Sequence, residues 1–216
     1  MGRSGWTVRV AGVLAGVLVA GACSSGPPPP VDERPYEQQI QASRAEKDRI
    51  FRTDASVSPI PAGERATFPG LVYFPIDHRY RVPAALHEEQ SDPPVVINLP
   101  TSSTEMQPEE RVGRLEFTLD GTAYTLTAFA AEGDLSRLFV PFNDLTNGRE
   151  TYGGGRYLNL DRTATGVYDL DFNRAYQPSC VYNHSYVCPY PPSENRLPIA
   201  ITAGERLGSE SRQAAP

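Results

Sequence analysis

Short segments of alternating polar and apolar residues dominate the chain from residue 71 onward, and turn residues separate them. This period-two pattern is typical of β-strands with one buried face. The clearest example covers residues 115–126, where two alternating segments flank Asp120 and Gly121. Asp-Gly is a residue pair that two-residue type I′ turns prefer, so this segment predicts a β-hairpin. The segments predicted as strands cover residues 71–74, 80–86, 95–99, 114–119, 122–130, 137–142, 156–160, 167–172 and 199–202.

The connections between these segments favour antiparallel pairing, because nearly all of them are too short for the crossover that parallel strands need. Gly and Pro together supply 39 of the 216 residues, which is too many helix-breaking residues for a helical bundle or a coiled coil. We therefore predict a mainly β fold, either a single antiparallel β-sandwich or a partly open β-barrel.

One N-terminal amphipathic helix is predicted before the strands. Residues 36–52 contain no Gly or Pro, and apolar side chains such as Ile40 and Ile50 recur at helical spacing. Pro35 fits the first helical position, where a missing N–H costs nothing. The β-rich domain, with this helix, is expected to cover residues 36–205, and a polar, disordered tail is expected over residues 206–216.

The first residues have the pattern of an export signal. Arg3 and Arg9 precede an uncharged run over residues 10–22, which small residues close just before Cys23. Residues 20–23 resemble a bacterial lipobox, although Ala20 stands where Leu is usual. We predict a signal peptide over residues 1–22, a diacylated (palmitate-bearing) Cys23 anchored in the lipid bilayer, and a Pro-rich tether over residues 23–35. An ordinary cleaved signal peptide is the alternative.

The formal net charge of −6 argues against nucleic acid as a partner, because phosphate backbones are bound mainly by basic surfaces. The export signal places the protein outside the cytoplasm, on the cell membrane. The oligomeric state has no indicator in the sequence.

Cys180 and Cys188 are predicted to form a disulfide, the usual state of paired cysteines outside the cytoplasm. A metal site that uses Cys180, His184 and Cys188 is the alternative, but this spacing matches no common zinc pattern and a fourth ligand is missing. No metal or cofactor is therefore predicted.

Several motifs together resemble the bacterial and archaeal domain-of-unknown-function family 1684. They lie at residues 142–148, 151–157, 171–176, 178–182, 188–195 and 197–199, with further likeness at 47–48, 58–60, 73–75 and 203–205. The resemblance covers nearly all of the chain after the signal. It implies no activity, because the family has no established one, and it is consistent with export.

The best candidate for a site is a polar strand face. Asp169, Asp171 and Asn173 alternate with apolar residues, which predicts that the three share one face of a strand. They would divide acid and base roles or hold a cation; a solvated strand face is the alternative. Further side chains expected to line such a ligand-binding or catalytic site are Tyr152, Arg156, Tyr157, Tyr176 and Glu194.

Three functions are compatible with these observations. The first is an exported, membrane-anchored lipoprotein that binds a small ligand or an envelope component through its β domain. The second is a hydrolase-like enzyme that uses Asp169 or Asp171 with Asn173 and Arg156, although the sequence contains no recognised catalytic motif. The third is a structural protein of envelope assembly.

Overall fold

The hairpin around Asp120 and Gly121 is present and occupies the middle of the sheet. It joins β4 (Met106–Leu119) to β5 (Thr122–Ala131). Asp120 and Gly121 have φ angles of 50° and 77°, and two successive positive φ angles define a type I′ turn. The prediction of this hairpin is confirmed.

The computed structural model describes residue 2, residues 32–131 and residues 136–208. The predicted signal peptide (apart from residue 2), Cys23, most of the tether and the end of the tail lie outside the described residues. The described part contains no helix that is long and apolar enough to cross a membrane.

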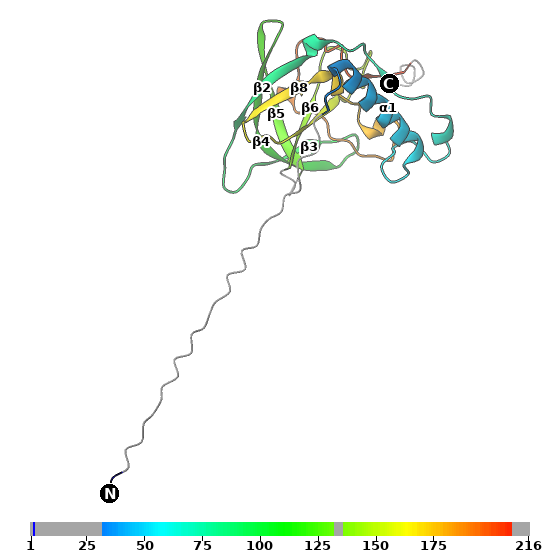
Figure 1. The fold of residues 1–216 in the computed structure, drawn as a ribbon. Coiled ribbons are helices and arrows are strands. Elements are labelled where there is room, and N and C mark those ends of the chain that lie inside the picture. The colour runs from blue at the N-terminus through cyan, green and yellow to red at the C-terminus, as the bar shows by residue number, and fades with distance from the viewer. Residues whose placement is uncertain (1, 3–31, 132–135, 209–216) are drawn as a thin grey trace. The chain divides into compact units, whose positions relative to one another are not determined.

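The described strands form a nearly closed antiparallel barrel (Figure 1). Its seven-stranded sheet, counted over the described residues, has the order β7-β6-β5-β4-β2-β8, and β3 pairs with the first part of β4. The end strands β7 and β8 also contact each other, so the prediction of a partly open barrel is confirmed. The other strands of this sheet are β2 (Arg81–Glu88), β3 (Val96–Pro100), β6 (Arg137–Phe142), β7 (Arg156–Asp161) and β8 (Val167–Asp171).

One α-helix, α1 (Tyr36–Thr53), is present in the described residues and lies beside the barrel (Figure 1). Pro35 directly precedes it as the N-cap. Ile40 is buried, while half of the helix residues are exposed and the others are partly buried. The predicted amphipathic helix with a narrow apolar face is therefore confirmed. Short 3₁₀ turns are η1 (Arg65–Thr67), η2 (His78–Tyr80), η3 (Phe172–Arg174), η4 (Ser179–Val181) and η5 (Ser193–Asn195).

A β-bulge divides β4 into two parts that face opposite ways. The pairing of β4 with β5 shifts between Arg111 and Gly113, which inserts one extra residue. After the bulge, Leu115 and its alternate neighbours point into the core. Before the bulge, Arg111 pairs with Phe129, which lies on the opposite face of the sheet from the core residues of β5. The predicted strand 114–119 is thus only the second part of a longer strand.

The predicted strand at residues 199–202 is wrong. The last strand is instead β9 (Glu205–Arg206), which pairs with β1 (Val72–Tyr73). Ile201 and Ala203 are fully buried, and their carbonyl oxygens accept hydrogen bonds from a side chain rather than from a neighbouring strand. Leu207 is buried as well, so residues 206 and 207 belong to the domain and not to the predicted tail.

The donor to these carbonyls is Arg156, whose side chain is fully buried. Its Nη2 lies 2.7 Å from Asp144 Oδ2 and 2.8 Å from the carbonyl oxygen of Ile201. Its Nη1 donates to the carbonyls of Ala203 and Glu205. The guanidinium therefore joins β7, the loop after β6 and the C-terminal segment inside the domain.

We expect Arg156→Met to reduce the free energy of unfolding by about 3–5 kcal/mol, because it leaves the Asp144 carboxylate buried without its cation. Arg81→Met is the control, since Arg81 pairs with Asp169 at the surface and exposed pairs contribute about 1 kcal/mol or less. Urea unfolding followed by circular dichroism measures both values. Equal losses in the two variants would contradict the role of Arg156.

Candidate functional site

The predicted polar face formed by Asp169, Asp171 and Asn173 is divided among separate structural contacts. Asp169 is exposed and pairs with Arg81, whose Nη2 lies 2.7 Å from Oδ2. Asp171 is buried and caps η3 by accepting the N–H of Asn173 at 3.0 Å. Because β8 ends at Asp171 and the chain then turns, Asn173 does not continue the strand face.

The side chains of Asp171 and Asn173 are also engaged by other segments. The hydroxyl of Tyr36 donates to both carboxylate oxygens of Asp171, at 2.9 and 3.0 Å. Asn173 accepts the N–H of Asp77 and donates to its carbonyl. These two residues therefore fix α1 and the segment before η2 onto the end of β8.

Three more predicted site residues lie in other places. Arg156 is enclosed in the core, and Glu194 is exposed on η5. Tyr152 is half-buried, and its pKa is raised by burial and by its neighbour Tyr190. Arg156 pairs with Asp144, whereas Asp169 pairs with Arg81 and Asp171 binds Tyr36 and Asn173. The arginine and the aspartates of the hydrolase hypothesis therefore make separate contacts.

Tyr157 and Tyr176 are predicted site residues that line the same cavity. Their backbones exchange two hydrogen bonds of 2.9 and 3.0 Å, which attach the segment after η3 to β7. Their rings are 5.6 Å apart at 84°. Burial raises the pKa of the Tyr157 hydroxyl well above its usual range and that of Tyr176 to about 12, so both hydroxyls are protonated at neutral pH.

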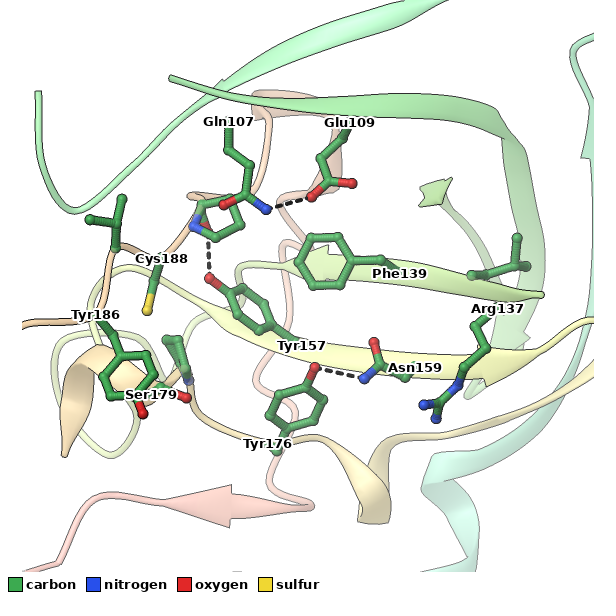
Figure 2. Close-up of a pocket in the computed structure, with 14 residues that line it drawn as sticks. Gln107, Glu109, Arg137, Phe139, Tyr157, Asn159, Tyr176, Ser179, Tyr186 and Cys188 are labelled. Carbon is green, nitrogen blue, oxygen red and sulfur yellow. Dashed lines mark hydrogen bonds between the residues drawn. The ribbon is translucent and has the colours of Figure 1, made fainter. Parts of the chain in front are cut away.

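We call the space beside them the Glu109 cavity, with a volume of about 400 Å³. It lies on the outer face of β6 and β7, under the first part of β4 and the segment that follows η4 (Figure 2). Its lining residues are Gln107, Glu109, Arg137, Leu138, Phe139, Tyr157, Asn159, Tyr176, Pro178, Ser179, Tyr186, Val187, Cys188 and Pro189.

Glu109 is the unusual group in this lining. It is only 3% exposed, and Oε1 accepts a hydrogen bond from Gln107 Nε2 at 2.7 Å. The other oxygen, Oε2, is buried and has no hydrogen-bond partner among the described residues. Burial raises the pKa of this carboxyl, and the bond from Gln107 opposes the shift only in part. Buried polar atoms are nearly always satisfied, so Glu109 is a group that lacks a donor.

The β4 bulge explains the position of Glu109. The residue lies on the same strand face as Arg111 and therefore opposite the core. Without the extra residue, the alternation of Leu115 and Phe117 would turn Glu109 into the barrel core. In Figure 2, the Glu109 carboxyl points from β4 toward the ring of Phe139.

The opposite walls of the cavity combine aromatic and polar groups. Phe139 and Tyr157 pack edge to face with ring centroids 4.9 Å apart. The Tyr157 hydroxyl donates to the carbonyl of Pro189 at 2.6 Å, and Asn159 Nδ2 donates to the Tyr176 hydroxyl at 2.8 Å. Arg137 is exposed at the rim and lies 3.0 Å from an Asp161 carboxylate oxygen. An apolar slot therefore has a carboxyl at one side and a cation at the other.

The two described cysteines lie together next to this cavity as buried free thiols. The N–H of Cys180 donates to Cys188 Sγ at 3.1 Å. Interaction between the thiols lowers the pKa of Cys180 and raises that of Cys188. The predicted disulfide is absent from this structure and stays a prediction. His184 is exposed, and the described residues contain no group of three or more His, Cys, Asp or Glu side chains that would hold a metal.

Sequence reasoning missed Glu109, Gln107, Arg137 and Asn159. The segment before the bulge contains charged residues and Pro108, so its alternation is weak. The one available signal was that Gln107, Glu109 and Arg111 alternate along the chain and so form a polar series on one face of a strand. Nothing in that series indicates that a distant segment buries it.

The fold and the cavity define a β-barrel domain with an acidic group in a partly aromatic pocket. The family "Protein of unknown function (DUF1684)" matches residues 66–206, and the chain belongs to this family. It is also similar to an uncharacterized protein of the archaeon Haloarcula marismortui, solved by solution NMR, at 43% sequence identity and a TM-score of 0.63. The match covers 81% of this chain and 96% of that chain. No curated protein matches the chain.

The raised pKa of Glu109 predicts a pH dependence of stability. Between the unfolded pKa, about 4.3, and the higher folded pKa, the folded state binds more protons, so the free energy of unfolding falls as the pH rises. This contribution is complete below the unfolded pKa and is lost as the pH passes the folded pKa. We expect Glu109→Gln to remove this fall and to be more stable than the unchanged protein at neutral pH by on the order of 1 kcal/mol.

Urea unfolding at a series of pH values measures this difference. Glu116→Gln is the matched control, because Glu116 is an exposed residue of the same strand, and it should keep the pH profile of the unchanged protein. Coincident profiles for Glu109→Gln and the unchanged protein would show that burial does not raise the pKa of this carboxyl.

Proposed function

We propose that this domain binds a small organic molecule in the Glu109 cavity, through a ligand cation or hydrogen-bond donor that pairs with the Glu109 carboxyl. The observation that carries the proposal is Glu109 Oε2, which is buried without a donor in the wall of a cavity. A charge-assisted hydrogen bond to a ligand would supply that donor and offset the cost of burying the carboxylate.

The size and lining of the cavity support this proposal. Its volume of about 400 Å³ is within the range of pockets that hold small ligands. The rings of Phe139 and Tyr157 offer an apolar surface for a flat or hydrocarbon part of the ligand. Tyr186 and Val187, both exposed, line the same cavity and would cover part of a bound molecule.

Benzylamine is a suitable first probe, because it joins a ring to a cation. We expect it to bind the unchanged protein and to bind Glu109→Gln about tenfold or more weakly, since hydrogen bonds to charged groups contribute about 1.5–3 kcal/mol. Ligand-observed NMR titration measures the affinity. The control is Glu194→Gln, which alters an exposed carboxylate outside the cavity and should leave the affinity unchanged.

Two results would reject the binding proposal. One is equal affinity of the unchanged protein and Glu109→Gln for benzylamine, which would place the amine elsewhere. The other is the absence of any binding by amines, amidines and amides, which would favour the alternative of a structural protein in envelope assembly.

We also propose that the domain works outside the cytoplasm, held at the membrane by a lipid on Cys23. The basic, then apolar, then small-residue order of residues 3–23 supports export. Two acyl chains on one cysteine would give stable anchoring. The nearness of Cys180 and Cys188 in the fold supports a disulfide in an oxidising compartment.

Intact-mass spectrometry of the protein expressed with its first 23 residues tests this location. We expect a mature chain that begins at an acylated Cys23, fractionates with membranes and contains no free thiol under denaturing conditions. Cys23→Ala should be released from the membrane fraction. An unmodified Cys23 would reject the anchor, and two reactive thiols in exported protein would reject the disulfide.

A further inference from the structure

A second cavity, of about 240 Å³, lies next to the Glu109 cavity. The two share Arg137, Asn159 and Tyr176 in their linings, so they are neighbours across one wall. We call this second space the cationic cavity, because four of its lining residues are Arg44, Lys47, Arg137 and Arg174.

These four cations come from separate parts of the fold. Arg44 and Lys47 lie one turn apart on α1, Arg137 begins β6, and Arg174 ends η3. The acidic residue in the same lining is Glu205. The cavity therefore has an excess of positive charge within a protein whose net charge is −6.

Glu205 does not neutralise this excess, because its carboxylate is already fully engaged. Glu205 is 1% exposed, and its carboxylate accepts a hydrogen bond from Lys47 Nζ at 2.5 Å. It also accepts the N–H of Gln177 at 2.9 Å and the hydroxyl of Tyr182 at 3.2 Å. Lys47 is thus balanced by Glu205, and Glu205 forms no ion pair with the other three cations of this lining.

Arg44 is the cation with the least compensation. It is half-buried, and its guanidinium donates to the carbonyls of Phe74 at 3.1 Å and Asn173 at 3.4 Å. It forms no ion pair with a carboxylate of the described residues, and its Nε is buried without an acceptor. It also lies over the Tyr73 ring at 4.4 Å. A guanidinium in such surroundings is favourable for an anion that arrives with a ligand.

Arg137 pairs with the exposed carboxylate of Asp161, and Arg174 pairs with the buried carboxylate of Asp171. Arg137 lies 3.0 Å from Asp161, and Arg174 lies 3.3 Å from Asp171. The side chains of both arginines are about half exposed, and exposed ion pairs are weak in water. The Arg137 guanidinium can therefore turn toward a ligand at little cost, whereas Arg174 contributes its positive charge from its place beside Asp171.

We propose that the cationic cavity binds the oxyanion of a small molecule, a carboxylate or a phosphate group, with Arg44 as its main partner. The inference rests on the proposed function of the neighbouring cavity and narrows its ligand class. The complete ligand carries a hydrogen-bond donor or cation that binds Glu109 and an oxyanion that binds Arg44. The part that links these two groups would lie along Asn159 and Tyr176, which line both cavities. Amines that carry a carboxylate or a phosphate at the far end of a carbon chain have these two groups at the separation that two neighbouring cavities require.

Inorganic phosphate and acetate, each titrated at constant ionic strength, are the probes for the oxyanion. Backbone amide NMR shifts of the isotope-labelled protein measure their affinity and position. We expect shifts around Arg44 and Arg174, and about tenfold or more weaker binding in Arg44→Gln. Binding of phosphate alone or of acetate alone would assign the group, and binding of both would show that the cavity accepts either oxyanion.

Arg49→Gln is the matched control, because Arg49 lies on the same helix, is exposed and pairs with Glu46. It should bind the probes as the unchanged protein does. Arg174→Gln provides a second test if Arg44→Gln fails to fold, and it should also weaken binding. The inference is overturned if neither probe binds, or if Arg49→Gln weakens binding as much as Arg44→Gln does.

Benzylamine distinguishes failure of this inference from failure of the proposed function. If benzylamine binds in a Glu109-dependent way while both anions fail, the Glu109 cavity keeps its function and the cationic cavity is not an anion site. If phosphate or acetate binds at Arg44 while amines fail, the anion site stands and the role of Glu109 is rejected.

Discussion

The buried guanidinium of Arg156 organises the part of the domain on which the cavities depend. Burying a cation is expensive unless its donors find acceptors. Here both Nη atoms bond to Asp144 and to three backbone carbonyls of the C-terminal segment, while Nε has no partner among the described residues. In that segment the carbonyls of Ile201 and Ala203 accept hydrogen bonds from the guanidinium rather than from a neighbouring strand. The segment then leads Glu205 to its buried position, where the carboxylate fixes α1 through Lys47 and the segment before η4 through Gln177. The buried ion pair of Arg156 and Asp144 thus helps to position α1 and the segment before η4, which both line the cavities.

The β4 bulge makes the other decisive contribution, because it changes the face on which Glu109 lies. In the core, a lone carboxyl would face only hydrocarbon and would be strongly destabilising. On the outer face, it meets Gln107 and the rim of a cavity. Gly113 makes the geometry feasible, since a Cβ there would approach the carbonyl oxygen of His87 to 2.3 Å. The position of Glu109 is therefore set by the backbone pairing of β4 with its two neighbours, β5 at the bulge and β2 at Gly113.

Local sequence patterns predicted the helices, strands and turns that neighbouring residues determine. The Asp120-Gly121 turn, the helix over residues 36–52 and the strand 137–142 are set by neighbouring residues, and all three are present. The segment 199–202 is not a strand, because the Ile201 carbonyl bonds to the Arg156 side chain, 45 residues away, instead of to a neighbouring strand. For the candidate site, Tyr157 and Tyr176 were found, but Glu109 was not, because its burial depends on segments far away in the chain. Asp171 and Asn173 were identified as polar and close together, and their role is to cap a turn.

The hydrogen bond from Asn159 to Tyr176 lies in the wall that both cavities share. A group that bound Asn159 from one side would release or reorient the Tyr176 hydroxyl on the other side. Binding in the two cavities would then be thermodynamically linked. Because linkage is reciprocal, an amine would change the affinity for an anion by the same factor by which the anion changes the affinity for the amine. The protein would then distinguish a single molecule that carries both groups from a mixture of an amine and an anion. The distinction would come from the cooperativity between the two cavities as well as from the contacts in each cavity.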